Sequence, residues 1–178
     1  MSIERAKAPD PHDHLPPRPQ FSLRSDDVQD GSPQDPRHAH PSAGGENVSP
    51  QLSWSGFPDD TQGFAVTCFD PDAPTGSGFW HWVVFNLPAS TTELVTGASP
   101  DGLPAGAVEA RNDHGEPGYG GAAPPPGDGP HRYVYTVHAL DTDALELDAS
   151  APPAAVGFKL AFHTLARAAI RPAYELAS

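Results

Sequence analysis

Two near-continuous apolar runs enclose a short acidic, proline-rich segment, and this arrangement constrains the fold more than any other part of the sequence. The runs are residues 63–69 and 81–87, and the segment 70–74 reads Asp-Pro-Asp-Ala-Pro. Proline fixes its own φ and restricts the preceding residue, so the backbone loses freedom where the first run ends. The sequence predicts two β-strands joined by a rigid acidic loop. We also expect a cis bond between Ala73 and Pro74, since tight turns at binding sites favour such bonds.

Further apolar runs extend the β pattern. Residues 21–23, 51–54 and 133–140 each have strand-like composition, and residues 63–69 are apolar on both faces of a period-two pattern. The chain contains 23 prolines and 17 glycines, and long loops separate the runs without alternating helices. We therefore predict a mainly β fold in which antiparallel sheets pack face to face as a sandwich, with residues 63–69 as a central strand.

One helix is expected near the C-terminus, among small peripheral helices. Ser150 is the candidate N-cap, residues 152–153 are prolines suited to a first turn, and Pro172 ends the pattern. The apolar stripe at near-helical spacing consists of Val156, Leu160, Phe162, Leu165 and Ala169. After the helix, Tyr174 either approaches the binding pocket or packs on the domain.

The first 20 residues differ in character from the rest. They are polar and proline-rich, so they bury too little apolar surface to offset the entropy of ordering. We expect a disordered tail over residues 1–20, with His12 and His14 solvated rather than bound to metal, and a single domain over residues 21–178. Because no basic region followed by an apolar run is found at the N-terminus, and no stretch is long enough to cross a bilayer, we expect a soluble cytoplasmic protein without membrane insertion.

Charge and cysteine content narrow the function. The formal net charge of -13 repels phosphate backbones at long range, so nucleic acid is not expected as a partner. A small anion can still bind where backbone N–H groups and an imidazolium are aimed at it. Cys68 is the only cysteine and lies in an apolar run, which indicates a buried, inert thiol.

A second chemistry-bearing segment has the same form as the first. A Gly/Pro-rich loop over residues 120–130 delivers His131, Arg132 and Tyr133 to the start of an apolar run. A carboxylate such as Asp70 beside His81 or His131 would favour the imidazolium, whose other N–H then donates to an anion. The aromatic residues that could form a wall of this pocket, suited to an ammonium group, are Phe79, Trp80 and Trp82.

These two segments carry a family resemblance. The Asp-Pro-Asp-x-Pro segment followed by Trp80-His81, and the Gly/Pro loop ending in His131-Arg132-Tyr133, resemble the signatures of the phosphatidylethanolamine-binding proteins, particularly their bacterial Raf-kinase-inhibitor-like branch. The likeness spans nearly everything after residue 20. It implies a Greek-key β-sandwich and a binding module without a cofactor. The ligand-site residues that it implies are Asp70, His81, Pro125, His131 and Tyr133.

The resemblance also implies partners. The ligand would be a small anionic or phosphorylated head group such as phosphorylethanolamine, and the protein would modulate a protein kinase or another signalling protein. Three tryptophans and the apolar loop residues near the pocket mouth suggest a homodimer or an associating face.

Some side chains keep two interpretations. Asp72 either organises the turn or contacts the ligand, and Trp80 and Tyr174 are secondary candidates. Arg132 lies between two site residues on a strand, so its side chain should point away from theirs and form a salt bridge. His138 lies in an apolar run and is expected to be a satisfied core histidine.

The competing function is a metal-dependent hydrolase or oxygenase that uses Asp70, Asp72, His81 and His131 as a metal-binding set. Against it, the sequence lacks a compact His-x-His or His-x-Asp pair on a core strand and a Gly-x-Ser-x-Gly nucleophile elbow. We therefore favour a non-catalytic protein.

Overall fold

The computed structural model describes residues 5–178, which form ten β-strands, one α-helix and three short 3-10 helices. The strands are β1 Ser22–Arg24, β2 Leu52–Ser55, β3 Gly63–Asp70, β4 Phe79–Pro88, β5 Glu93–Leu94, β6 Val108–Glu109, β7 His131–Arg132, β8 Val134–Leu140, β9 Thr164–Ile170 and β10 Ala173–Tyr174. The helices are η1 Pro11–His14, η2 Pro36–His38, η3 Pro41–Ala43 and α1 Pro153–His163. Within the described residues, no helix is both long and apolar enough to span a membrane.

The central sheet has five antiparallel strands in the order β6-β4-β3-β8-β9. Strand β3 lies in the middle, where Cys68 pairs with Trp82 of β4 on one side and Tyr135 of β8 on the other. Its residues are buried except for a half-buried Phe69. This confirms the prediction that residues 63–69 form a central strand, and it confirms that the Cys68 thiol is buried.

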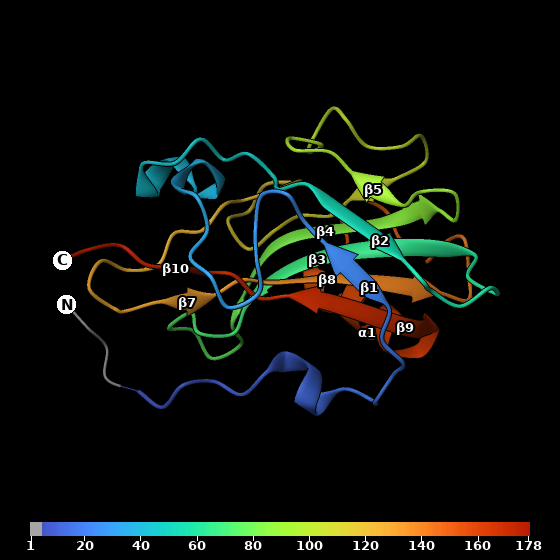
Figure 1. The fold of residues 1–178 in the computed structure, drawn as a ribbon, viewed down its shortest axis with the longest axis horizontal. Helices are drawn as coiled ribbons and strands as arrows, with labels where there is room; N and C mark the ends of the chain where they lie inside the picture. The colour runs from blue at the N-terminus through green and yellow to red at the C-terminus, as the bar shows by residue number, and fades with distance from the viewer. Residues whose placement is uncertain (1–4) are drawn as a thin grey trace.

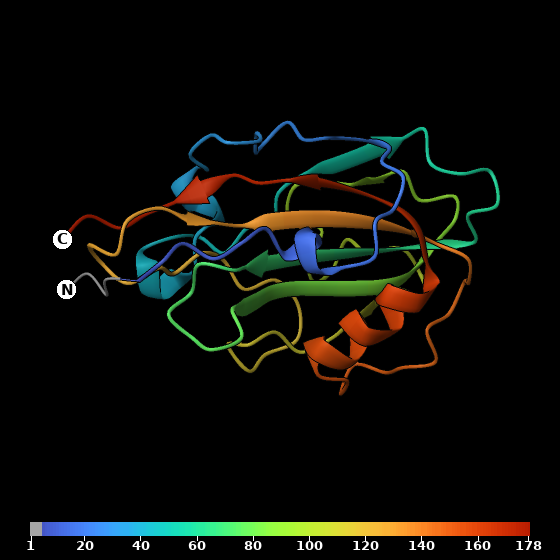
Figure 2. The ribbon, with the colours of Figure 1, turned by 90° about the horizontal axis from the view of Figure 1, so that it is seen from below.

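Both faces of the central sheet are covered. Successive side chains of β3 point to opposite faces, and each face packs in its own hydrophobic cluster. One face, with Phe64 and Val66, packs against Leu52 and Trp54 of the three-stranded sheet β1-β2-β5. In Figure 1 this small sheet crosses in front of β3, β4 and β8. The opposite face packs against α1, which is seen beside the sheet in Figure 2. The predicted mainly β fold of antiparallel sheets is confirmed.

The C-terminal helix is shorter than the sequence predicts. It ends at His163, and residues 164–170 form β9, which pairs with β8 from Leu140↔Thr164 to Tyr135↔Ile170. Backbone pairing with β8 therefore outweighs the helical spacing of the apolar residues in this segment. Phe162, assigned to the buried stripe, is instead 67% exposed. Ser150 is not the cap either: its N–H and hydroxyl bond to Asp148, and the N-cap is Pro152.

Residues 5–20 lie against the domain in the structure, whereas we expected an unattached tail. Asp10 caps η1 by accepting from the His12 N–H at 2.9 Å and pairs with the Arg171 guanidinium. The His12 ring bonds to the Thr136 hydroxyl at 3.1 Å, and burial, followed by the charge of Arg167, lowers its pKa to about 4. The segment is anchored mainly by polar contacts, which a search for apolar core patterns does not detect.

Candidate functional site

The acidic loop after β3 is tied to β7 by its own carboxylates. Asp70 accepts the N–H of Asp72 at 2.7 Å, which closes a tight turn. Asp72 in turn accepts from the backbone N–H of Arg132 at 3.0 Å and from its guanidinium at 2.7 Å. The predicted Arg132 salt bridge is confirmed, and the Asp72 carboxylate ties the acidic loop to β7. The predicted cis bond is wrong: within residues 5–178 the cis peptide lies between Ser99 and Pro100.

His131 lies between two carboxylates. Its Nδ1–H donates to Asp70 at 2.8 Å, and its Nε2–H donates to Asp128 at 3.0 Å. Burial would lower the pKa of His131, but the hydrogen bonds and charges of Asp70 and Asp128 outweigh burial and raise it. Because both ring nitrogens contact carboxylates, the imidazolium form of His131 is favoured, as the sequence predicts for a histidine beside Asp70. Its second N–H, expected to point at an anion, is held by Asp128.

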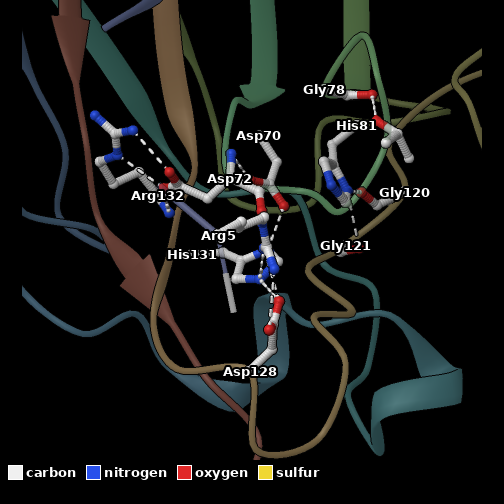
Figure 3. A network of polar contacts seen from close by, with 11 residues as sticks. Arg5, Asp70, Asp72, Gly78, His81, Gly120, Gly121, Asp128, His131 and Arg132 are labelled. Atoms are coloured by element: carbon white, nitrogen blue, oxygen red, sulfur yellow. Dashed lines mark hydrogen bonds and ion pairs between the residues drawn. The ribbon is translucent and has the colours of Figure 1, made fainter. Parts of the chain in front are cut away.

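His81 has the opposite protonation state. Its Nδ1–H donates to the carbonyl oxygens of Gly120 at 2.7 Å and Gly121 at 3.1 Å (Figure 3). Burial lowers its pKa to about 3, more strongly than these carbonyls raise it. The ring is neutral near pH 7, so Nε2 carries a lone pair and accepts hydrogen bonds. The expectation that His81 donates to an anion therefore needs correction, because desolvation removes its charge.

One cavity collects most of the predicted site residues. It has a volume of about 320 Å³, and its walls come from the acidic loop, β4 and the Gly/Pro loop. The predicted residues in its lining are Asp70, His81, Pro125 and His131. Tyr133 lies behind this wall, 5.0 Å from the His81 ring centre. Its buried hydroxyl lies near the Ala123 N–H but makes no hydrogen bond of ordinary geometry among the described residues.

The secondary candidates lie elsewhere. Trp80 alternates with His81 along β4, so it faces the opposite side of the sheet and lines a separate cavity beside α1. Tyr174 pairs with His131 in the β10–β7 ladder and packs against the core, without lining the 320 Å³ cavity. Trp82 is a core residue whose indole N–H donates to Glu109 at 2.8 Å. Of the three predicted aromatic wall residues, only Phe79 lines the cavity.

Sequence reasoning missed a histidine on the cavity wall. His114 lines the cavity beside Phe79, and its ring stacks on His40 at a centroid distance of 4.3 Å. Its buried Nε2 has no hydrogen-bond partner among the described residues. No local motif marks His114. Its loop contacts β4 through bonds between residues far apart in the sequence, such as Gly120 N–H to His81 O at 2.8 Å.

The sequence-based prediction of the site also missed Arg5 and Asp128. Asp128 lies in the Gly/Pro loop three residues before His131, and Arg5 comes from the N-terminal segment to bond with it (Figure 3). Only the spacing of Asp128 from His131 could have suggested either contact. His38, in the loop before β2, is also buried, and its ring bonds to the Val48 carbonyl at 2.7 Å.

Comparisons with known proteins identify the family of this chain. The family model for phosphatidylethanolamine-binding protein matches residues 24–175. The protein YbhB of Escherichia coli K12 is 49% identical over 154 residues, covering 84% of this chain and 97% of YbhB. The crystal structure of E. coli YbcL, described as a new member of the mammalian PEBP family, superposes with a TM-score of 0.85 at 46% identity, covering 88% of this chain and 99% of YbcL.

A more distant structure shares the fold. The phosphatidylethanolamine-binding protein of Plasmodium vivax is 12% identical, with a TM-score of 0.62 over 93% of this chain and 90% of that protein. The two signature segments, the antiparallel fold and the close bacterial relatives thus agree. The chain belongs to the phosphatidylethanolamine-binding protein family.

Proposed function

We propose that the protein is a non-catalytic binding module whose 320 Å³ cavity holds a small phosphate-bearing head group of the phosphorylethanolamine type. The observation that carries the proposal is the meeting of Asp70 and His81 with Pro125 and His131 around one cavity. These residues come from two segments that lie about 60 positions apart in the chain, as the His131–Asp70 bond shows (separation 61).

The cavity lining suits a ligand with both a cation and an anion. The Asp70 carboxylate and the neutral His81 Nε2 accept hydrogen bonds, and the Phe79 ring offers a face for an ammonium group. The His131 imidazolium, whose N–H groups are held by Asp70 and Asp128, adds a positive charge that favours a phosphate. A head group with an ammonium and a phosphate matches both kinds of lining.

The metal-dependent enzyme is less well supported. Its proposed ligands are committed to other partners: Asp72 to Arg132, and His131 to Asp70 and Asp128. Among residues 5–178, no group of three or more His, Cys, Asp or Glu side chains is placed to hold a metal ion. Metal analysis of the purified protein tests this alternative, since stoichiometric metal that a chelator removes would support an enzyme.

Regulation of a protein kinase or another signalling protein is a further part of the proposal. It rests on the family resemblance alone, and a pocket of this kind would let a bound head group control such an interaction. Co-purification of a partner whose binding responds to phosphorylethanolamine would support it.

Calorimetric titration of the full chain tests the head-group pocket. His131→Ala should weaken binding of both inorganic phosphate and phosphorylethanolamine, by about 1.5 to 3 kcal/mol for the loss of hydrogen bonds to a charged group. His81→Ala should weaken binding of phosphorylethanolamine alone, because His81 accepts from the ammonium. His163→Ala is the matched control, since this histidine pairs with Asp141 outside the cavity.

The pH dependence follows from His131. Its pKa is raised in the folded protein, so the imidazolium is present below that value and is lost as the pH rises through it. Phosphate affinity should therefore fall as pH increases in that range, while His81 stays neutral. Unchanged binding in both pocket variants, or affinity that rises with pH, would contradict the head-group assignment.

A further inference from the structure

The N-terminal segment places an arginine at the binding site. The Arg5 guanidinium holds the Asp128 carboxylate with two hydrogen bonds, Nη1 to Oδ1 at 3.0 Å and Nη2 to Oδ2 at 2.7 Å. Nη2 also donates to the Asp72 carbonyl and lies 3.5 Å from the His131 Nε2 (Figure 3). The Arg5 side chain is 30% exposed and that of Asp128 is fully buried. Arg5 is therefore part of the His131 environment, although it lies outside residues 24–175 matched by the family model.

Asp128 has the surroundings of a bound anion. One of its carboxylate oxygens, Oδ2, accepts from both Arg5 and His131, and Oδ1 accepts the second guanidinium bond. A two-pronged guanidinium contact combined with an imidazolium is how proteins hold carboxylate and phosphate ligands. The chain thus fills a position for an anion with its own side chain.

A second cavity adjoins this position. It has a volume of about 510 Å³ and lies between residues 5–8, the acidic loop and Asp128. Ala73, Thr75 and His131 line both this cavity and the 320 Å³ cavity. The two cavities therefore share part of their wall at His131, which contacts the Asp128 carboxylate, and the larger cavity offers space beside the Asp128 side chain.

Among the described residues that form this group, the charges balance while Asp128 is included. Asp70 and Asp128 carry two negative charges against the two positive charges of Arg5 and His131, and Asp72 is paired separately with Arg132. When the Asp128 carboxylate moves away, two cations face the single charge of Asp70. An incoming anion then restores the balance.

We propose that Asp128 is an internal competitor of the ligand: the anionic group of the head group displaces its carboxylate and is then held by Arg5 and His131. Arg5 thereby becomes a ligand-binding residue that the N-terminal segment supplies. The inference rests on the proposed function, because it takes the ligand to be anionic. It adds Asp128 as the residue that competes with the ligand and Arg5 as a residue that binds it.

Calorimetry with inorganic phosphate and the full chain provides the first test. Asp128→Asn removes the competing charge and should bind phosphate about tenfold more tightly than wild type, the scale of one charge-assisted hydrogen bond. Arg5→Gln should bind it about tenfold more weakly, and the double variant should lose the gain of Asp128→Asn. Lys7→Gln is the matched control, since Lys7 lines the same cavity two residues along the segment and should change affinity by less than about twofold.

Limited proteolysis gives a second readout. Trypsin cleavage after Lys7 should be faster in Asp128→Asn than in wild type, because the ion pair between Arg5 and Asp128 is lost. Phosphate should restore protection in Asp128→Asn and should not restore it when Arg5→Gln is also present. Thermal melting shows that each variant is folded.

The outcomes separate this inference from the proposed function. If wild type binds phosphate but neither Asp128→Asn nor Arg5→Gln differs from Lys7→Gln, the competitor role is overturned and the head-group pocket stands. If Asp128→Asn binds phosphate and wild type does not, the competitor role is supported. If none of the variants binds, both ideas fail.

Discussion

The Asp72→Ala substitution is the sharpest test of how the acidic loop is held. The Asp72 side chain is 7% exposed and accepts three hydrogen bonds from Arg132, whose own side chain is 20% exposed. Removing one partner of a buried ion pair costs about 3 to 5 kcal/mol, because the remaining charge is left without compensation. Since water reaches part of Arg132, we expect the lower end, about 3 kcal/mol.

Urea denaturation at pH 7, monitored by circular dichroism, measures this loss of unfolding free energy. In a separate thermal melt, the midpoint of unfolding should fall by about 6 to 12 °C for a chain of this size. Asp141→Ala is the control. Its ion pair with His163 spans 2.8 Å, but the two side chains are 49% and 35% exposed, so its removal should cost less than about 0.5 kcal/mol.

The stability that Asp72 contributes should depend on pH in a direction that its pKa determines. Burial would raise the pKa of Asp72, but the hydrogen bonds from Arg132 outweigh burial and lower it. A carboxyl with a lowered folded pKa contributes stability above its unfolded pKa of about 4 and loses it as pH falls through the folded value. The gap between wild type and Asp72→Ala should therefore narrow below about pH 4. A variant as stable as Asp141→Ala at pH 7, or a gap independent of pH, would refute this account of the loop.

Three further outcomes are expected. Burial raises the pKa of the Cys68 thiol well above its usual value, so a thiol reagent should react with it only after unfolding; fast labelling of native protein would contradict this. Truncation before Phe21 should cost more than about 1 kcal/mol in urea unfolding, because it removes the ion pair of Asp10 with Arg171 and uncovers the cavity beside α1; a smaller loss would support the expectation of a disordered tail over residues 1–20. Sedimentation at several concentrations should reveal a homodimer, and a constant monomer mass would remove that expectation.

Strands whose burial follows a local pattern could be predicted from the sequence. In β3 and β8 nearly every residue is buried, and their apolar runs locate them to within one residue. Residues 164–170 could not be assigned in this way, because their strand depends on pairing with residues 135–140. That pairing is invisible to a helical or period-two count along one segment.

The site was predictable where short motifs carry it. The pairing of Asp70 with His131 follows from two signature segments, but the protonation of His81 does not. Its neutral state results from deep burial, which outweighs the carbonyl acceptors at Gly120 and Gly121, about 40 residues away. Those groups come together only in the folded chain. For this reason the sequence predicts that His81 donates a hydrogen bond to an anion, whereas its neutral Nε2 accepts hydrogen bonds.

Strand β9 is the last strand of the five-stranded sheet, so within residues 5–178 one side of its backbone lacks a neighbouring strand. The N-terminal segment covers part of that side: the Arg167 N–H donates to the Pro19 carbonyl at 3.0 Å, and its guanidinium donates to the Pro16 carbonyl at 3.0 Å. Pro16, Pro17 and Pro19 have no backbone N–H, so the segment can accept from β9 but cannot extend the ladder outward. The proline-rich segment therefore protects an open sheet edge from strand addition by another chain, the step that begins β-aggregation.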